Sequence, residues 1–220
     1  MKFNEMTYTR PDIDALLTRC KELAAKAAAA ASDEEIVDVY YEQSHAFADY
    51  NTAANLANIH YTCDTRDAYW KAEQDFFDEN SPAISNASTE ISRAFLSNPH
   101  VDALTKAFGT TCVAGMKNAV LSMDERTIDL QKEYNALVSK YQQVYGGALV
   151  EFDGKKLTIP QLGPYKESTD PAIRRGAYEA EASYFDAHRD ELDSLYTQIV
   201  KNLNAQAKIM GYHDYSELSY

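Results

Sequence analysis

The sequence has few basic residues for its number of acidic ones. It contains 21 lysines and arginines against 34 aspartates and glutamates, which gives a formal net charge of −13. Binding to phosphate groups requires a concentrated basic surface, and this composition does not supply one. We therefore expect neither nucleic acid nor an anionic membrane as a partner.

Long apolar runs are also missing. No run approaches the roughly 20 residues that span a bilayer, and the N-terminus MKFNEMTYTRPD lacks the apolar core of a signal peptide. Cys20, Cys63 and Cys112 lie far apart and form no CxxC pair. This usage is typical of reduced, buried thiols rather than of a disulfide framework, so we expect a cytoplasmic protein.

Sequence motifs of catalysis are absent as well. There is no HExxH, GxSxG, Walker loop or GxGxxG. The acidic stretch 64–79 is explained by charges on the solvent-exposed face of an amphipathic helix. Three pairs have a spacing that suits a shared ligand: His188 with Glu191, His213 with Glu217, and His60 with Cys63. Structural zinc takes four protein ligands and catalytic zinc takes three plus water, so we interpret each pair as surface or helix-end polar residues. The sequence predicts no catalytic residue and no metal ligand, and it leaves substrate-binding residues unknown.

What the sequence does contain is a series of amphipathic helices. Apolar residues at spacings of three and four predict a first helix from Pro11 to Ala31. Ser32 with Glu35 has the spacing of a capping box and predicts the start of a second helix. Asn80-Ser81-Pro82 predicts a break between two helices, with Pro82 in the first turn of the later one.

The helical pattern continues to residue 147. Ser122 with Glu125 predicts the cap of a long helix that Gly146-Gly147 ends. Further on, Pro160 and Pro164 predict an extended connection. Asp170-Pro171 then opens a helix, and another follows it with Gly211 at its end.

One β-hairpin interrupts this helical pattern at about residues 148–160. The strand-like runs 149–152 and 156–159 flank Asp153-Gly154, a dipeptide that supplies the positive φ angles of a type I′ turn. The hairpin divides the chain into an N-terminal helical region, 1–147, and a second part, 148–220. We predict an all-α fold, a multi-helix array with this single hairpin.

The last residues start a further element. Asp214 with Glu217 has the spacing of a helix cap, yet only about two turns of helix fit before Tyr220. A helix of this length is marginal without packing. Two interpretations stay open: a chain truncated at the opening of its next helix, and a frayed terminal turn.

Three stretches together resemble a known family. DTRDAYWKAEQDFFDEN (64–80), EFDGKKLTIPQLGPYKESTDPAIRRGAYEA (151–180) and MGYHDYSELSY (210–220) are similar, in this order and spacing, to the N-terminal portion of oligoendopeptidase F-like zinc metallopeptidases, relatives of thimet oligopeptidase. The opening MKFNEMTYTRPDIDALL is similar too, so the resemblance covers the whole chain.

The resemblance implies a larger, mainly helical peptidase that cuts short peptides in a deep cleft. Its zinc motif, HExxH with a downstream glutamate, would lie beyond residue 220 in a C-terminal catalytic region that this chain lacks. No zinc ligand can be carried onto a position here, so the chain alone is expected to hold no zinc and to hydrolyse nothing. We expect it to form one wall of the peptide cleft. The alternative is a stand-alone helical module that binds peptides or a protein partner without catalysis.

Overall fold

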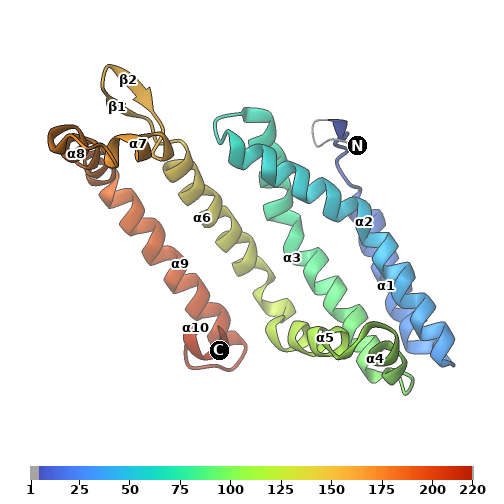
Figure 1. Ribbon diagram of the computed structural model, residues 1–220. Coiled ribbons are helices and arrows are strands. Elements are labelled where there is room, and N and C mark those ends of the chain that lie inside the picture. Colours follow the sequence, from blue (N-terminus) through green and yellow to red (C-terminus); the bar gives the residue numbers. More distant parts are fainter. Residues whose placement is uncertain (1–4, 220) are drawn as a thin grey trace.

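The computed structural model describes residues 5–219. Within these residues it contains ten α-helices, the 3₁₀ segments Glu125–Thr127 and Pro160–Leu162, and one two-stranded hairpin (Figure 1). The prediction of an all-α fold with a single hairpin is confirmed. The helices are α1 (Ile13–Ala29), α2 (Asp33–Cys63), α3 (Ala68–Ser97), α4 (Asp102–Phe108), α5 (Thr110–Ser122), α6 (Ile128–Gly146), α7 (Gly163–Lys166), α8 (Pro171–Ala187), α9 (Arg189–Ile209) and α10 (Tyr215–Ser219).

The first two helices begin at side-chain caps. The Asp12 carboxylate accepts the backbone N–H of Ala15 at 2.9 Å, so α1 begins just inside the predicted range. The Ser32 hydroxyl accepts the N–H of Glu35 at 3.1 Å, and the Glu35 carboxylate accepts the N–H of Ala31 at 2.7 Å. These bonds satisfy N–H groups that a helix start leaves without partners. The predicted start of the second helix at Ser32 is confirmed.

The predicted break at Pro82 is wrong. Helix α3 runs through this residue without interruption, and Pro82 is buried inside it. Proline has no N–H, so the carbonyl of Asp78, one turn earlier, loses its partner within the helix. The side-chain amide of Asn135 in α6 donates to that carbonyl at 3.0 Å. A neighbouring helix thus compensates for the proline.

Two other local predictions need correction. Asp124, not Ser122, caps the segment that leads into α6: its carboxylate accepts the N–H of Arg126 at 2.9 Å in the 3₁₀ segment Glu125–Thr127. The connection behind the hairpin is not extended, because a 3₁₀ segment, Pro160–Leu162, and α7 occupy it. Proline suits both starts, since its fixed φ matches the first turn of a helix.

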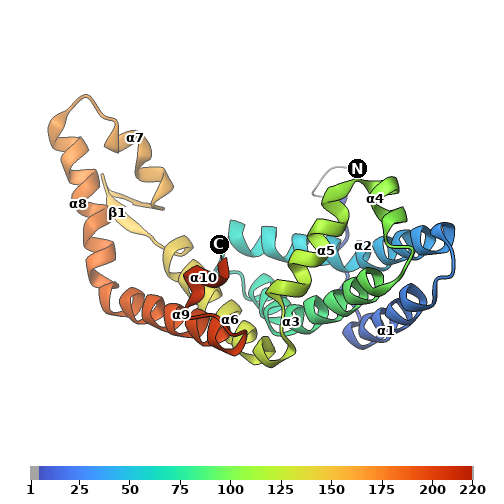
Figure 2. The same cartoon turned by 90° about the horizontal axis from the view of Figure 1, so that it is seen from below.

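The main core lies where α1 to α5 pack together. Leu23, Ile36 and Phe95, from α1, α2 and α3, have 0% exposure. Farther along the chain, α9 packs on α6, where the buried Asn202 donates to the carbonyl of Leu130 at 2.9 Å. Viewed from below, α5 and α10 project on the same side of α3 and α6, and the hairpin with α7 and α8 forms an arm at one end (Figure 2).

The hairpin has the predicted turn. Strands β1 (Val150–Phe152) and β2 (Lys155–Leu157) pair antiparallel, with Val150 opposite Leu157. Asp153 and Gly154 have φ values of 52° and 68°, as a type I′ turn requires. A small second core, Ala148, Val150, Ile159 and Leu162, lies beneath the hairpin.

The later caps follow the sequence prediction. The Asp170 carboxylate accepts the N–H of Ala172 at 2.8 Å at the start of α8, and Gly211 has φ 94° after α9. Asp214 accepts the N–H of Glu217 at 3.0 Å, and Glu217 in turn accepts the N–H of His213 at 2.7 Å. The predicted cap before α10 is therefore confirmed. Across residues 5–219, no helix has both the length and the apolar character needed to span a membrane.

Gly109 joins α4 to α5 in a conformation that only glycine adopts readily. Its φ and ψ are 87° and 168°, although a Cβ there would meet nothing within 4 Å. We expect Gly109→Ala to lower the free energy of unfolding by about 1.5 kcal/mol through backbone strain alone. Gly115, inside α5, is the matched control: its Cβ would also meet nothing within 4 Å, and Gly115→Ala should raise stability by about 0.5–1 kcal/mol. Urea unfolding of both variants tests this, and changes of the same sign would contradict it.

Candidate functional site

The three pairs that the sequence spaces for a shared ligand, and that we interpret as polar surface or helix-end residues, lie near the ends of helices. His188, at the junction of α8 and α9, has Nδ1 2.9 Å from the carbonyl oxygen of Tyr184 and stacks on that ring. Glu217 is engaged in the α10 cap. His60 stacks on Trp70, with 4.1 Å between ring centroids. Among residues 5–219, no group of three or more His, Cys, Asp or Glu side chains could hold a metal ion.

The three cysteines differ in their surroundings. Cys20 is buried in the main core, and burial raises the pKa of its thiol. Cys112 is partly buried, whereas Cys63, the last residue of α2, is exposed. The prediction of three buried thiols is wrong for Cys63, because the helix end carries this residue out into solvent.

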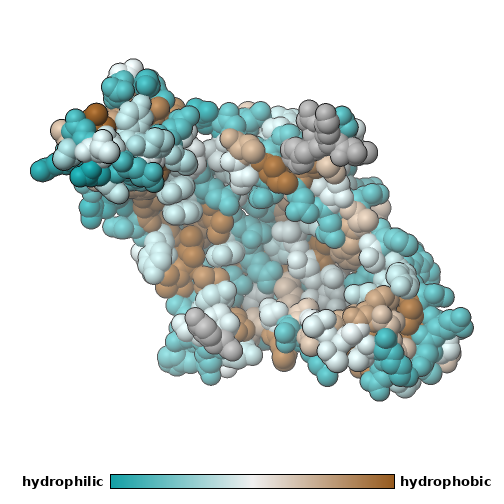
Figure 3. All heavy atoms as spheres, in the orientation of Figure 1, coloured by the Kyte–Doolittle hydropathy of each residue, from teal (hydrophilic) through white to brown (hydrophobic). Residues whose placement is uncertain are grey.

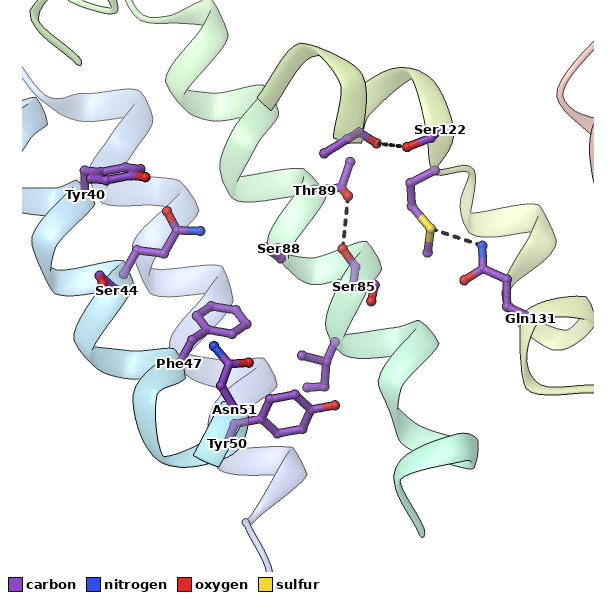
Figure 4. A pocket seen from close by; sticks show the side chains of 14 residues that line it. Tyr40, Ser44, Phe47, Tyr50, Asn51, Ser85, Ser88, Thr89, Ser122 and Gln131 are labelled. Atoms are coloured by element: carbon purple, nitrogen blue, oxygen red, sulfur yellow. Dashed lines mark hydrogen bonds between the residues drawn. The ribbon is translucent and has the colours of Figure 1, made fainter. Parts of the chain in front are cut away.

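A hollow of about 650 Å³ lies between α2, α3 and α5. Figure 4 shows its two walls: Tyr40, Phe47 and Tyr50 come from α2, and small hydroxyl residues come from α3. Its lining consists of Tyr40, Gln43, Ser44, Phe47, Tyr50, Asn51, Ile84, Ser85, Ser88, Thr89, Ala119, Ser122, Met123 and Gln131. One wall therefore offers aromatic rings and the other offers hydroxyl groups.

A second hollow, of about 520 Å³, adjoins the first between α3, α6, α9 and α10. Ser85, Ser122 and Gln131 line both hollows, so the two lie side by side and are treated together. We call the two hollows together the trough. The second hollow adds Ser81, Pro82, Tyr134, Asn135, Leu203, Gln206, Met210, Tyr215, Leu218 and Ser219. The face of the molecule in Figure 3 is hollowed at its centre, in front of α3.

The trough is lined by neutral side chains. A quarter of all residues are charged, yet neither hollow has an aspartate, glutamate, lysine, arginine or histidine among its described lining residues. The nearby Asp78 carboxylate is engaged by the hydroxyl of Ser139 and the amide of Gln74, and burial raises its pKa. The surface therefore offers hydrogen-bonding groups and no formal charge.

Several polar groups of the trough already have partners in the protein. The Thr89 hydroxyl donates to the Ser85 carbonyl at 3.0 Å, and the Gln131 amide donates to the Thr127 hydroxyl at 2.9 Å. Gln43 differs from them. Its Oε1 is buried and accepts no hydrogen bond from the described residues.

The comparisons with known proteins identify the family. The model of the peptidase M3 N-terminal domain matches residues 3–123, more than half of the chain. The chain belongs to the peptidase M3 family. A search of curated proteins finds no match.

Solved structures of peptidases match the whole chain with a TM-score of 0.96. One is described as an oligoendopeptidase F, at 33% identity, and another is PZ peptidase A with an inhibitor, at 30%. A third is described as an oligoendopeptidase F from Bacillus anthracis strain Ames, also at 30%. The chain spans 39–40% of the length of these chains, so it corresponds to part of an M3 peptidase, and the predicted resemblance to the family's N-terminal region is confirmed.

M3 membership suggests zinc in the parent enzyme, but the residues described here do not fit a zinc site. Catalytic zinc needs three protein ligands, and no three His, Cys, Asp or Glu side chains of residues 5–219 are grouped to hold a metal ion. The His60 and His188 rings stack on Trp70 and Tyr184, and His213 Nδ1 lies 3.2 Å from Asp214 Oδ2.

The sequence interpretation missed the trough. A signal was present in α3, where Ser81, Ser85 and Ser88 recur at spacings of four and three and so share one helix face. An apolar stripe marks the face that packs in the core, whereas this hydroxyl stripe marks the face toward the trough.

Proposed function

We propose that this chain is the N-terminal, non-catalytic part of a zinc-dependent oligoendopeptidase that hydrolyses short peptides. It forms one wall of the substrate cleft and restricts entry to short, unfolded chains. Full-length alignment with part of larger M3 peptidases supports this role. The trough is the observation that carries it, because a neutral hydrogen-bonding surface suits a peptide backbone better than a charged cofactor.

The two parts of the chain have different roles in this proposal. Residues 1–147 form the N-terminal helical region, and residues 148–220 lead into a catalytic region that supplies zinc and the groups that activate water. This chain alone then hydrolyses no peptide. The proposal places the protein in the cytoplasm, where its three free cysteines stay reduced.

A chimera tests the proposal. In it, this chain replaces the matching part of the oligoendopeptidase F from Bacillus anthracis. We expect the chimera to cleave a short quenched-fluorescent peptide, to lose this activity with a chelator, and to spare the same sequence inside a folded protein. An inactive but folded chimera would contradict the proposed role.

Ser85→Arg probes the trough in the same chimera. Ser85 lines both hollows, so an arginine would fill the trough and bring a charge into its neutral lining. We expect kcat/KM to fall about tenfold, the effect of about 1.4 kcal/mol, with the melting temperature nearly unchanged because Ser85 is exposed. Ser183→Arg, at an exposed helical serine of α8 outside the trough, is the control and should leave kcat/KM unchanged. Equal effects of the two variants would remove the trough from the substrate path.

A further inference from the structure

We propose that a groove between α6 and α9, next to the arm, is the surface on which the C-terminal catalytic region of the protein docks. We call it the aromatic groove, and it lies between Tyr141 and Tyr145 of α6, Phe185 of α8 and Tyr196 of α9. The inference rests on the proposed function and names the surface that holds the two regions together. The occupant is an apolar segment of the catalytic region.

The aromatic groove is a concave surface of about 500 Å³. The rings of Tyr141 and Tyr145 stack with 6.2 Å between their centroids, and the Phe185 ring lies 5.9 Å from that of Tyr145. The three rings therefore form one continuous wall. Side chains of α9, Tyr196 among them, complete the lining.

The rings of this groove are in contact with water. Tyr196 is 71% exposed, and Tyr141 and Tyr145 are 45% and 44% exposed. Figure 3 shows hydrophobic residues gathered over α6 and α9, to the left of the central hollow. Single exposed apolar residues are ordinary, but a contiguous set in a concave surface marks a place where another polypeptide segment packs. Tyrosine suits such a place, because its ring is apolar while its hydroxyl can still form a hydrogen bond.

The kind of occupant follows from what already packs on the same face of α6 and α9. Tyr134 of α6 and Leu203 of α9 line the second hollow together with Tyr215 of α10, and α10 packs on α9. Tyr134 is seven residues before Tyr141, and Leu203 is four residues after Ile199, which lines the aromatic groove. Residues at these spacings share one helix face. A helix therefore already packs at one end of this face, and the aromatic groove continues it.

The size and charge of the occupant can also be stated. This chain spans 39–40% of the length of the M3 peptidases that it matches, so the larger part of such a protein lies outside the residues described here. Asp193 is the only charged residue among the described lining residues of the aromatic groove. The segment that fits is therefore apolar, with a basic residue where it faces Asp193.

The test compares the chain alone with the chimera by tyrosine nitration, with tetranitromethane as the reagent and peptide mass spectrometry as the readout. We expect the nitration rate of Tyr196 to fall about tenfold in the chimera, because a docked region excludes reagent and water. Tyr41 of α2, which is 52% exposed and packs on Phe108, is the matched control. It should react at the same rate in both proteins.

Tyr196→Asp separates docking from the folding of this chain. In the chain alone the melting temperature should stay unchanged, because the side chain is largely exposed. In the chimera it should fall by about 4 °C, since docking would bury the new carboxylate. Tyr41→Asp is the control, and it should change the melting temperature equally in the two proteins.

Equal nitration of Tyr196 in the two proteins, or an equal effect of Tyr196→Asp in both, would overturn the inference. Protection of Tyr196 in the chain alone that grows with protein concentration would also overturn it, because it would assign the groove to a second copy. The activity of the chimera separates this failure from failure of the proposed function. An active chimera with Tyr196 unprotected would leave the proposed function in place and remove the inference. Protection of Tyr196 in an inactive chimera would remove the proposed function and leave the docking surface.

Discussion

Asn98→Ala is expected to lower the free energy of unfolding by about 3 kcal/mol, the largest change among the variants considered. Asn98 follows α3 and is only 3% exposed. Its side-chain amide donates to the carbonyls of Ala27 and Ala30, both at 2.9 Å, and its oxygen accepts the N–H of His100 at 2.8 Å. Alanine would leave the last carbonyls of α1 without this donor, and each buried group left unpaired costs about 1–3 kcal/mol.

Two further variants isolate the cause. Asn98→Asp keeps an acceptor for His100 but cannot donate to the two carbonyls, so it should destabilise about as much as alanine. Asn55→Ala removes an exposed amide that bonds only within its own helix, and it should change stability by less than about 0.5 kcal/mol. Urea unfolding measures all three variants. A loss below about 1 kcal/mol for Asn98→Ala would contradict the account of this contact.

Glu73→Ala is expected to cost about 2 kcal/mol at neutral pH. Glu73 of α3 is 5% exposed. It accepts a hydrogen bond from the hydroxyl of Tyr8 at 2.5 Å and two from the Arg10 guanidinium, from Nε at 2.9 Å and from Nη2 at 2.7 Å. The contact fastens the segment before α1 to α3. Arg10 is half exposed and can regain water, so the cost is below that of a fully buried pair.

The same contact predicts a pH dependence. The hydrogen bonds from Arg10 lower the pKa of Glu73, against the opposing effect of burial. A group with a lowered folded-state pKa stabilises the fold above its unfolded pKa, about 4.3, and this contribution is lost as pH falls through the folded value. The difference in melting temperature between the parent protein and Glu73→Ala should therefore shrink on acidification.

Glu90→Ala is the control for both effects. Glu90 lies on the same helix and pairs with Arg93, but both side chains are about half exposed. An exposed pair of this kind contributes at most about 1 kcal/mol. Equal losses of stability in the two variants would contradict a special contribution of the Glu73 contact. So would a difference in melting temperature between the parent protein and Glu73→Ala that stays constant with pH.

Local signals in the sequence predicted the elements that depend on neighbouring residues. The cap at Ser32, the turn at Asp153-Gly154 and the positive φ of Gly211 are satisfied within a few residues, and each is confirmed. The predictions at Pro82 and Ser122 were wrong for opposite reasons. Pro82 stays helical because Asn135, distant in sequence, supplies the missing partner for the helix carbonyl, whereas Asp124 replaces the predicted serine locally.

The trough could not be assembled from the sequence. Its lining comes from α2, α3, α5, α6, α9 and α10, and no periodicity within one helix indicates which faces meet. The serine stripe of α3 indicates a binding surface only when the aromatic rings of α2 are known to lie opposite it. Gln43 gives no signal at all in the sequence, since a helical glutamine is ordinarily exposed.

The most direct test of the central claim is peptide hydrolysis by this chain alone, with Zn²⁺ added, measured beside the chimera. We predict that the chimera cleaves the quenched-fluorescent short peptide and that the chain alone does not. Cleavage by the pure chain that a chelator abolishes would contradict the account, because it would place the catalytic zinc within these residues.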